Sequence, residues 1–246
     1  MKFFLAVFLS IFLCSAMSAQ STVAGTDDDG DGTEHHLATG PFKEGSQDIP
    51  FHMTIRAAAT VPHAISNHAF RRSFTGIYNI TAGYYYQVFR GFQAGLEFEH
   101  SLWKTADNKI PGINTYAQSF HGGLHIGYDR VVGVNSVAFV GMSFLEGTMK
   151  YYGLSFVTAP DPAELKTKFT YSQISADAGF FFYTEGNFAI GFHFGADFTT
   201  YPFDPYQIYL NQHKAYISSD LNGNFAQFNG GFNVVFSFNS DKPKAQ

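Results

Sequence analysis

One stretch of the chain alternates strictly between large apolar residues and small or polar residues. Along 187–198, Phe188, Ile190, Phe192, Phe194, Ala196 and Phe198 alternate with Ala189, Gly191, His193, Gly195 and Asp197. A period of two places these two sets on opposite faces of a β-strand. A face of Gly, His and Asp makes a poor soluble core, whereas a Phe and Ile face suits lipid. The stretch therefore predicts a transmembrane strand whose polar face points into a barrel.

The same alternation recurs along most of the chain and predicts about eight strands. They are expected at 51–61, 75–88, 92–103, 116–130, 136–150, 169–182, 188–199 and 226–238. Short turns (89–91, 132–135 and 183–187) alternate with longer connectors (62–74, 104–115, 151–168 and 200–225). Short periplasmic turns and longer external loops are typical of outer-membrane barrels. We therefore expect an all-β, transmembrane, antiparallel up-and-down barrel, whose interior is just wide enough for side chains to fill.

The alternation also assigns a face to each residue of most strands. In the first strand, Phe51, Met53, Ile55 and Ala57 are expected to face lipid, with His52 and Arg56 inside. The strand at 136–150 is ambiguous, because both alternations of 137–145 contain apolar residues.

The segments outside the predicted barrel suggest export across a membrane. Residues 1–19 combine Lys2, an apolar stretch at 3–13 and small residues up to Ala19, which is typical of a secretory signal peptide. A lipoprotein signal using Cys14 is the alternative, although Leu13 is bulky for that motif. Residues 20–50 are Asp- and Gly-rich and are expected to be disordered, 51–238 to form the barrel, and 239–246 to be a C-terminal tail.

Composition excludes two other classes of protein. The chain has 45% hydrophobic residues but a mean hydropathy of only -0.08, which excludes a bundle of membrane-spanning helices. A net charge of -5 argues against nucleic acid as a partner. The 29 Phe, 14 Tyr and 24 Gly suit a lipid-facing wall, interfacial belts and a narrow lumen.

These features resemble a known family. The signal peptide, eight strands, aromatic belts and terminal segment 231–238 are similar to small outer-membrane β-barrels of the OmpA/OmpX type, particularly the porin-family barrels of Bacteroidetes-like bacteria. The resemblance implies an outer-membrane location, contact with outer-membrane lipid and assembly by the barrel-assembly machinery, whose aromatic signal Phe236 and Phe238 resemble. It implies no cofactor. The chain departs from the usual pattern by continuing to Gln246.

A set of ionisable residues is predicted to line the lumen. These residues are Arg56, Glu97, Glu99, His121, His125, Asp129, Asp177, His193 and Asp197. Because an isolated buried charge is very costly, we expect pairing, with Glu99 opposite His121 and Asp177 near His193. The resulting hydrogen-bonded network would plug the barrel. A metal site built from His121, His125 and His193 with a carboxylate is a weaker alternative, since imidazole and carboxylate suit several divalent ions.

Two further motifs are weak candidates for chemistry. Asp27, Asp29 and Asp31 match the first half of a calcium loop, but the twelfth position is Ala38 rather than a bidentate Glu. A solvated acidic linker is the stronger interpretation. His63 and Ser66 resemble the His and Ser of outer-membrane lipid A deacylases, but they stand three residues apart rather than two. On a strand they would lie on opposite faces, so we expect no catalysis.

Tyrosines in the longer connectors point to a contact surface. Tyr151 and Tyr152 in one loop and Tyr206, Tyr209 and Tyr216 in another are expected to meet a protein or glycan partner. The sequence therefore predicts a non-enzymatic barrel with a structural or surface-interaction role, or a subunit of an envelope complex. The alternatives are a narrow channel or carrier for small apolar solutes and, third, a lipid-modifying enzyme.

Overall fold

The computed structural model describes residues 51–238 apart from 107, 111–112, 134, 154–167, 186 and 213. The expected signal peptide at 1–19, the segment 20–50 with Asp27, Asp29 and Asp31, and the tail 239–246 lie outside the described residues. Within the described part of the chain, every helix is too short or too polar to span a bilayer.

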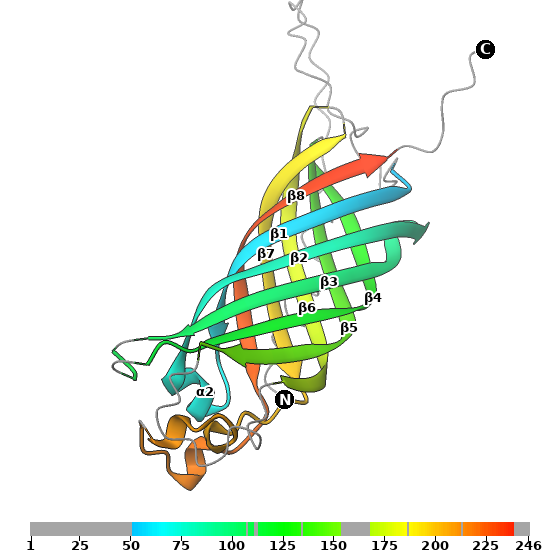
Figure 1. Cartoon of the computed structure of the whole chain (residues 1–246). Coiled ribbons are helices and arrows are strands. Elements are labelled where there is room, and N and C mark those ends of the chain that lie inside the picture. The colour runs from blue at the N-terminus through cyan, green and yellow to red at the C-terminus, as the bar shows by residue number, and fades with distance from the viewer. Residues whose placement is uncertain are drawn as a thin grey trace, which may run out of the picture. The chain divides into compact units, whose positions relative to one another are not determined.

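Eight antiparallel strands form a closed barrel (Figure 1). They are β1 (Met53–Ala64), β2 (Phe74–Phe89), β3 (Phe92–Thr105), β4 (Tyr116–Gly133), β5 (Ser136–Tyr152), β6 (Lys168–Glu185), β7 (Phe188–Thr199) and β8 (Ala226–Phe238). Each strand pairs with the next along the chain, and β1 closes the barrel by pairing with β8. The predicted up-and-down barrel of eight strands is therefore confirmed.

Large apolar side chains cover the outer wall of this barrel. Phe232 is 68% exposed, Leu124 63% and Phe192 47%, although all three lie within strands. A closed sheet bonds the backbone groups of every strand to its two neighbours, so none of these groups has to face hydrocarbon. An apolar wall around a closed sheet is the arrangement of a transmembrane barrel, as the alternation predicted.

The lumen holds apolar side chains that the sequence pattern did not place there. Phe51, predicted to face lipid, is only 4% exposed and stacks on Tyr183 with ring centroids 5.2 Å apart. That prediction is wrong because the chain bends at residue 52 and the regular alternation begins only with β1. The structure also resolves the ambiguity in β5, where Val137 and Phe139 point inward and are buried.

Buried apolar clusters lie at both ends of the barrel. The turn-end cluster lies beside the short turns and comprises Phe51, Val137, Phe139, Phe181, Tyr183, Ala189 and Val235. The loop-end cluster comprises Ala64, Ala69, Phe70, Phe74, Trp103, Ile110, Ile113, Ala117, Met149, Tyr151, Phe169, Tyr171, Tyr201, Phe203, Ile208, Leu210, Tyr216 and Phe225. The polar residues of the lumen lie between these two clusters.

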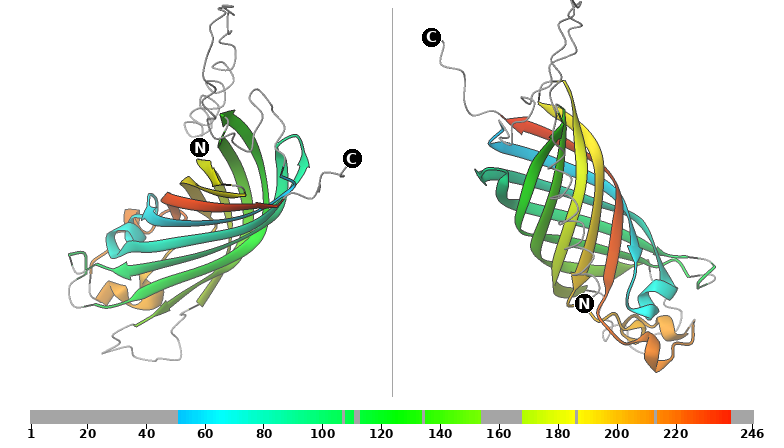
Figure 2. Two further views of the ribbon diagram at one scale, coloured as in Figure 1. Left: turned by 90° about the horizontal axis from the view of Figure 1, so that it is seen from above. Right: turned by 180° about the vertical axis from the view of Figure 1, so that it is seen from behind.

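Short helices cover the end of the barrel that carries the long connectors. The connector after β1 forms α2 (His68–Ser73), and 200–225 contains the 3₁₀ helices η3 (Pro205–Ile208), η4 (Leu210–Gln212) and η5 (Ser218–Asp220). Figures 1 and 2 show α2 beside the orange segment that carries these turns. The sequence predicted neither these helices nor the extension of β1 to Ala64. We call α2 together with 200–225 the cap.

Asn67 joins the parts of the cap. Its backbone has a positive φ of 52°, which Asn tolerates better than most residues. Its side-chain oxygen accepts from the amide of Phe70 at the start of α2, at 3.0 Å. Its side-chain nitrogen donates to the carbonyls of Phe203, at 3.1 Å, and Gly223, at 2.9 Å. One side chain therefore begins the helix and holds both ends of the 200–225 connector against it.

Candidate functional site

The arginine cluster of the lumen consists of Arg56, Gln93 and Asp129. Arg56 Nη2 donates to Gln93 Oε1 at 2.9 Å and forms an ion pair with Asp129, to which Gln93 also donates. Arg56 is 7% exposed, and its guanidinium carbon lies 4.9 Å from the ring centroid of Tyr85. A buried cation beside an aromatic face and a carboxylate is compensated by both.

Glu97 forms the next layer of the lumen. It accepts from the hydroxyl of Tyr85 and from Ser143 Oγ, both at 2.8 Å. His125 Nδ1 lies 3.2 Å from Glu97 Oε2, 2.9 Å from Ser143 Oγ and 3.9 Å from Asp177 Oδ1. These groups come from β2, β3, β4, β5 and β6, so their bonds tie much of the circumference together.

A closed ring of hydrogen bonds lies nearer to the loop end. Gln173 Nε2 donates to Glu99 Oε2 at 2.6 Å and to Ser175 Oγ at 2.9 Å, and Ser175 donates to Asp197 Oδ1 at 2.5 Å. Gln227 Nε2 closes the ring by donating to Asp197 Oδ2 at 2.6 Å and Glu99 Oε1 at 3.2 Å. This carboxylate ring holds two buried acids, and within the described residues every hydrogen bond that closes it comes from a neutral side chain. Both acids lie inside the barrel, as the alternation predicted.

The histidines do not pair as predicted. Glu99 and His121 are direct cross-strand neighbours, but neither ring nitrogen of His121 has a hydrogen-bond partner, and its ring packs edge-on against Tyr171 at 4.8 Å. His193 faces Gly179, and Asp177 faces Gly195. The pairing of β6 with β7 is therefore shifted by two residues from the one expected, so Asp177 and His193 are not direct cross-strand neighbours. The reason is that β6 continues to Glu185, which makes the hairpin tighter than the sequence suggested.

Within the described residues, the structure assembles neither the alternative metal site nor the alternative catalytic site. Within the described ranges, no three His, Cys, Asp or Glu residues converge as metal ligands. His63 lies in β1 on the exposed outer side, Ser66 Oγ donates to the carbonyl of Asn224 at 2.6 Å, and Asn67 begins α2. His63 is therefore exposed on the outer wall, whereas the Ser66 hydroxyl is bonded to the cap.

The loop tyrosines divide into buried and exposed residues. Tyr151 is 1% exposed in the loop-end cluster, and Tyr216 is 8% exposed with its hydroxyl 2.7 Å from Ser73 Oγ. Neither ring is available to an external partner, which corrects the prediction for both. Tyr206 is 49% exposed and Tyr152 is 38% exposed, while Tyr209 is half-buried with a φ of 56° after η3.

Sequence reasoning placed Gln93 and Gln173 inside the barrel but did not assign the neutral side chains of the lumen a role as hydrogen-bond donors. Gln93, Gln173, Ser175 and Gln227 are buried and bind the carboxylates, although none was singled out as a donor. The signal was present in part, because each stands on the inward parity of its strand. Parity alone does not say which acid an inward amide will reach.

The lumen beside the turn-end cluster contains a cavity of about 10 Å³. It is lined by residues that include Phe51, Thr54, Gln93, Asp129 and Tyr183. This volume is about the minimum that one water molecule requires. Side chains therefore leave little free space at this point.

The comparisons with known proteins match no family model and no curated protein. Solved structures with a similar fold include Neisserial surface protein A (TM-score 0.48, 10% identity, covering 76% of this chain and 97% of that one). Others are Ail, the attachment invasion locus protein of Yersinia pestis (0.44, 7%, 76% and 99%), and the N-terminal β-barrel domain of Pseudomonas aeruginosa OprF (0.37, 11%, 76% and 98%). The closed sheet with its apolar wall identifies the chain as a small eight-stranded transmembrane β-barrel, the architecture that the resemblance to OmpA/OmpX-type barrels implied.

Proposed function

We propose that this protein is a non-conducting barrel of the outer membrane that presents its cap at the cell surface in a structural or surface-interaction role. The observation that carries the proposal is the sequence of layers along the lumen. The turn-end cluster, the arginine cluster, the Glu97 layer, the carboxylate ring and the loop-end cluster follow one another from end to end. A barrel filled in this way is better suited to anchoring its cap in the membrane than to conducting solutes.

Energetics supports a closed lumen. An ion crossing the barrel would have to displace hydrogen bonds to charged groups, each of which contributes about 1.5–3 kcal/mol. It would also have to pass two apolar clusters that offer no replacement for its hydration shell. Several such losses in series make a steady current unfavourable.

Conductance of the folded protein in planar bilayers tests the proposal. We expect no stable channel, and a modest current that appears only when Glu99→Ala opens the carboxylate ring. Protein unfolded by heating before reconstitution is the control for leakage by misfolded chains. Large, stable openings of the unaltered protein would refute the proposal.

A narrow channel is the second candidate, because buried polar atoms in the lumen lack partners. Asn79 Oδ1, Asn229 Oδ1, Asn233 Oδ1 and both nitrogens of His121 make no hydrogen bond to the protein. Water molecules at these atoms would give a partly hydrated path. Conductance that persists in Glu99→Gln, which keeps the side-chain volume, would favour this candidate.

Location and orientation form part of the proposal. Removal of residues 1–19 as a signal peptide, assembly by the barrel-assembly machinery, and short turns facing the periplasm would place the cap outside. Outer-membrane fractionation and a gel mobility that changes on boiling test the location. Cleavage of the cap by protease added to intact cells tests the orientation, and recovery of the protein in the soluble periplasm would contradict both.

We also propose that the protein is not an enzyme and that a protein or glycan partner would contact Tyr152 and Tyr206. The exposure of these two rings supports the contact, because tyrosine offers a large apolar surface and a hydroxyl at low entropic cost. Tyr206→Ala should remove a co-purifying partner without changing gel mobility. Tyr209→Ala, which alters a half-buried ring in the same loop, is the matched control.

A further inference from the structure

The outer wall changes character near the loop end of β5 and β6. Going toward that end, Phe144 on β5 and Ile174 on β6 are the last large outward apolar residues before a run of polar ones, which ends on β5 at Tyr152. The outward positions that follow are Glu146, Thr148 and Lys150 on β5, and Ser172, Thr170 and Lys168 on β6. This change marks the boundary between hydrocarbon and the polar headgroup layer.

Two lysines stand side by side beyond that boundary. Lys150 and Lys168 are direct cross-strand neighbours and both are exposed. Like charges in this arrangement destabilise a sheet. No carboxylate among the described residues forms an ion pair with either lysine. An anion between the two ammonium groups would remove this repulsion.

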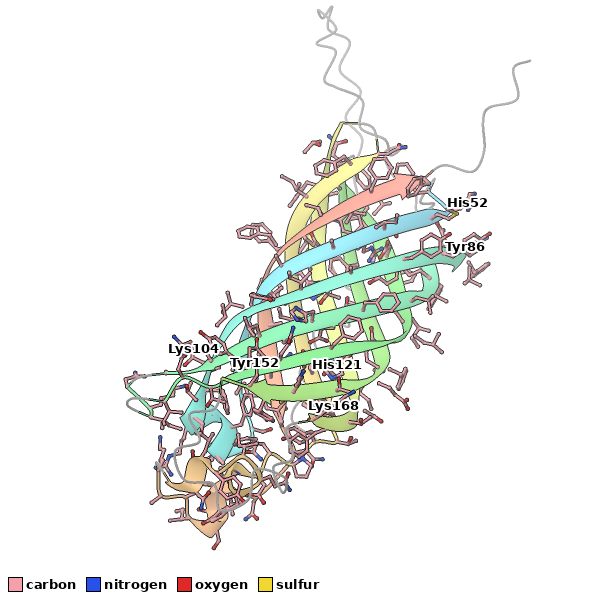
Figure 3. All side chains as sticks on the ribbon, viewed as in Figure 1. His52, Tyr86, Lys104, His121, Tyr152 and Lys168 are labelled. Carbon is pink, nitrogen blue, oxygen red and sulfur yellow. The ribbon has the colours of Figure 1, made fainter. Side chains whose placement is uncertain are left out.

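A tyrosine platform adjoins the lysine pair. Lys104, Tyr116 and Tyr152 are cross-strand neighbours in one row on β3, β4 and β5. The rings of Tyr116 and Tyr152 stack at 5.4 Å with an angle of 13°, and Lys104 Nζ lies 5.8 Å from the Tyr116 centroid. Figure 3 shows Lys104, Tyr152 and Lys168 along the loop end of the strands, away from His52 and Tyr86 at the other end.

We infer that Lys104, Lys150 and Lys168, with Tyr116 and Tyr152, bind the phosphorylated sugar headgroup of a glycolipid in the leaflet around the loop end. Ammonium groups act as point charges for phosphate, and the tyrosine faces offer an apolar platform for a sugar ring. The inference rests on the membrane orientation given under the proposed function.

We call Lys104, Lys150, Lys168, Tyr116 and Tyr152 the strip. The position of the strip favours a lipid over a soluble ligand. These side chains point sideways from the wall and continue the surface that contacts hydrocarbon, so a headgroup anchored by its own acyl chains is already held beside them. All the lysines in the described ranges lie toward the loop end, whereas the turn end carries Arg90 and Arg130. The strip therefore faces one leaflet only.

Other lysines at this end have a structural role instead. Lys109 Nζ donates to the carbonyls of Arg71, at 3.0 Å, and Phe74, at 2.7 Å, near the C-terminus of α2. Lys214 Nζ donates to the carbonyls of Arg72, at 2.8 Å, and Lys109, at 3.0 Å. Burial and the nearby Lys214 and Arg71 lower the pKa of Lys109. These two cations stabilise the cap. Their role therefore differs from that of the lysines that point outward from the barrel wall.

Binding of lipid A to the full-length folded protein tests the inference. The protein is placed in phosphatidylcholine nanodiscs with lipid A bearing two phosphates, or with enzymatically dephosphorylated lipid A, and bound lipid is counted by native mass spectrometry. We expect selective retention of the phosphorylated form. We also expect K150Q/K168Q to weaken that retention by roughly tenfold.

A matched variant separates local charge from total charge. Glu146→Gln removes an outward charge from the same face of β5 and should leave binding unchanged or strengthen it. Equal retention of dephosphorylated lipid A, or equal binding by K150Q/K168Q, would overturn the inference. Preferential capture by a soluble sulfated oligosaccharide over nanodisc lipid A would also overturn it and assign the strip to a soluble polyanion.

The proposed function fails by a different measurement. Conductance is recorded on the same protein in phosphatidylcholine without lipid A, where the wall has no phosphate ligand. A current there would refute the closed barrel and leave the lipid result standing. Loss of lipid A selectivity with no current would refute only the proposed glycolipid site and leave the closed barrel standing.

Discussion

The arginine cluster and the carboxylate ring compensate the charge of their buried acids in two different ways. In the arginine cluster, Asp129 meets the guanidinium of Arg56. In the carboxylate ring, Glu99 and Asp197 accept from the amides of Gln173 and Gln227 and the hydroxyl of Ser175. Neutral donors bring no desolvation cost of a second ion, but they also cancel no charge. The arginine cluster therefore compensates its acid with an ion pair, whereas the carboxylate ring compensates its two acids with hydrogen bonds from neutral groups.

The largest effect is expected for Arg56→Met. Removing one partner of a buried pair leaves Asp129 uncompensated, so the free energy of unfolding should fall by about 3–5 kcal/mol. Urea titration of the folded protein in lipid vesicles, followed by gel mobility, measures this loss. A loss below about 1 kcal/mol would mean that buried Asp129 does not depend on the charge of Arg56. The arginine cluster would then not differ from the carboxylate ring in how it compensates its acid.

Glu99→Gln should have a smaller effect. The amide keeps one acceptor oxygen for the ring and leaves no cation unpaired, so we expect a loss of about 1–2 kcal/mol. The same urea titration measures it, with Gln207→Glu on the exposed side of the cap as a control for charge change. A loss as large as that of Arg56→Met would reveal a hidden cation at the ring.

The double replacement Arg56→Met with Asp129→Leu sharpens the contrast. Removing both members of a buried ion pair in favour of apolar side chains is often neutral or stabilising. We expect the double variant to regain most of the stability that Arg56→Met loses, to within about 1.5 kcal/mol of the parent. Measured beside both single variants, it gives the coupling between the two residues, and additive losses would contradict the pair.

The smallest effect is expected for His121→Phe. The imidazole lies next to Glu99 in register but makes no hydrogen bond, so its removal should change the free energy of unfolding by less than about 1 kcal/mol. Tyr171→Phe is the control for the packing contact between the two rings. If His121→Phe costs as much as Arg56→Met, His121 serves as the cation of the ring.

The cap shows where local patterns stop being informative. The stretch 200–225 contains Tyr, Phe and Pro without a period, and its tyrosines were expected to face outward. Tyr216 is instead buried beside Ser73, because α2 and the loop-end cluster give it a surface to cover. No property of the residues next to Tyr216 in the chain distinguishes it from the exposed Tyr206.

The sequence alone determined the wall of this barrel, and the tertiary structure decided its interior. Phe188 to Phe198 alternates with a period that depends only on neighbouring residues, so the faces of β7 were predictable. Glu99, in contrast, meets Gln173 and Gln227, which lie 74 and 128 residues further along the chain. Those contacts depend on the stagger of the strands around the closed sheet. Because stagger accumulates over all eight strand pairs, parity shows that a side chain points inward but not which partner it will find.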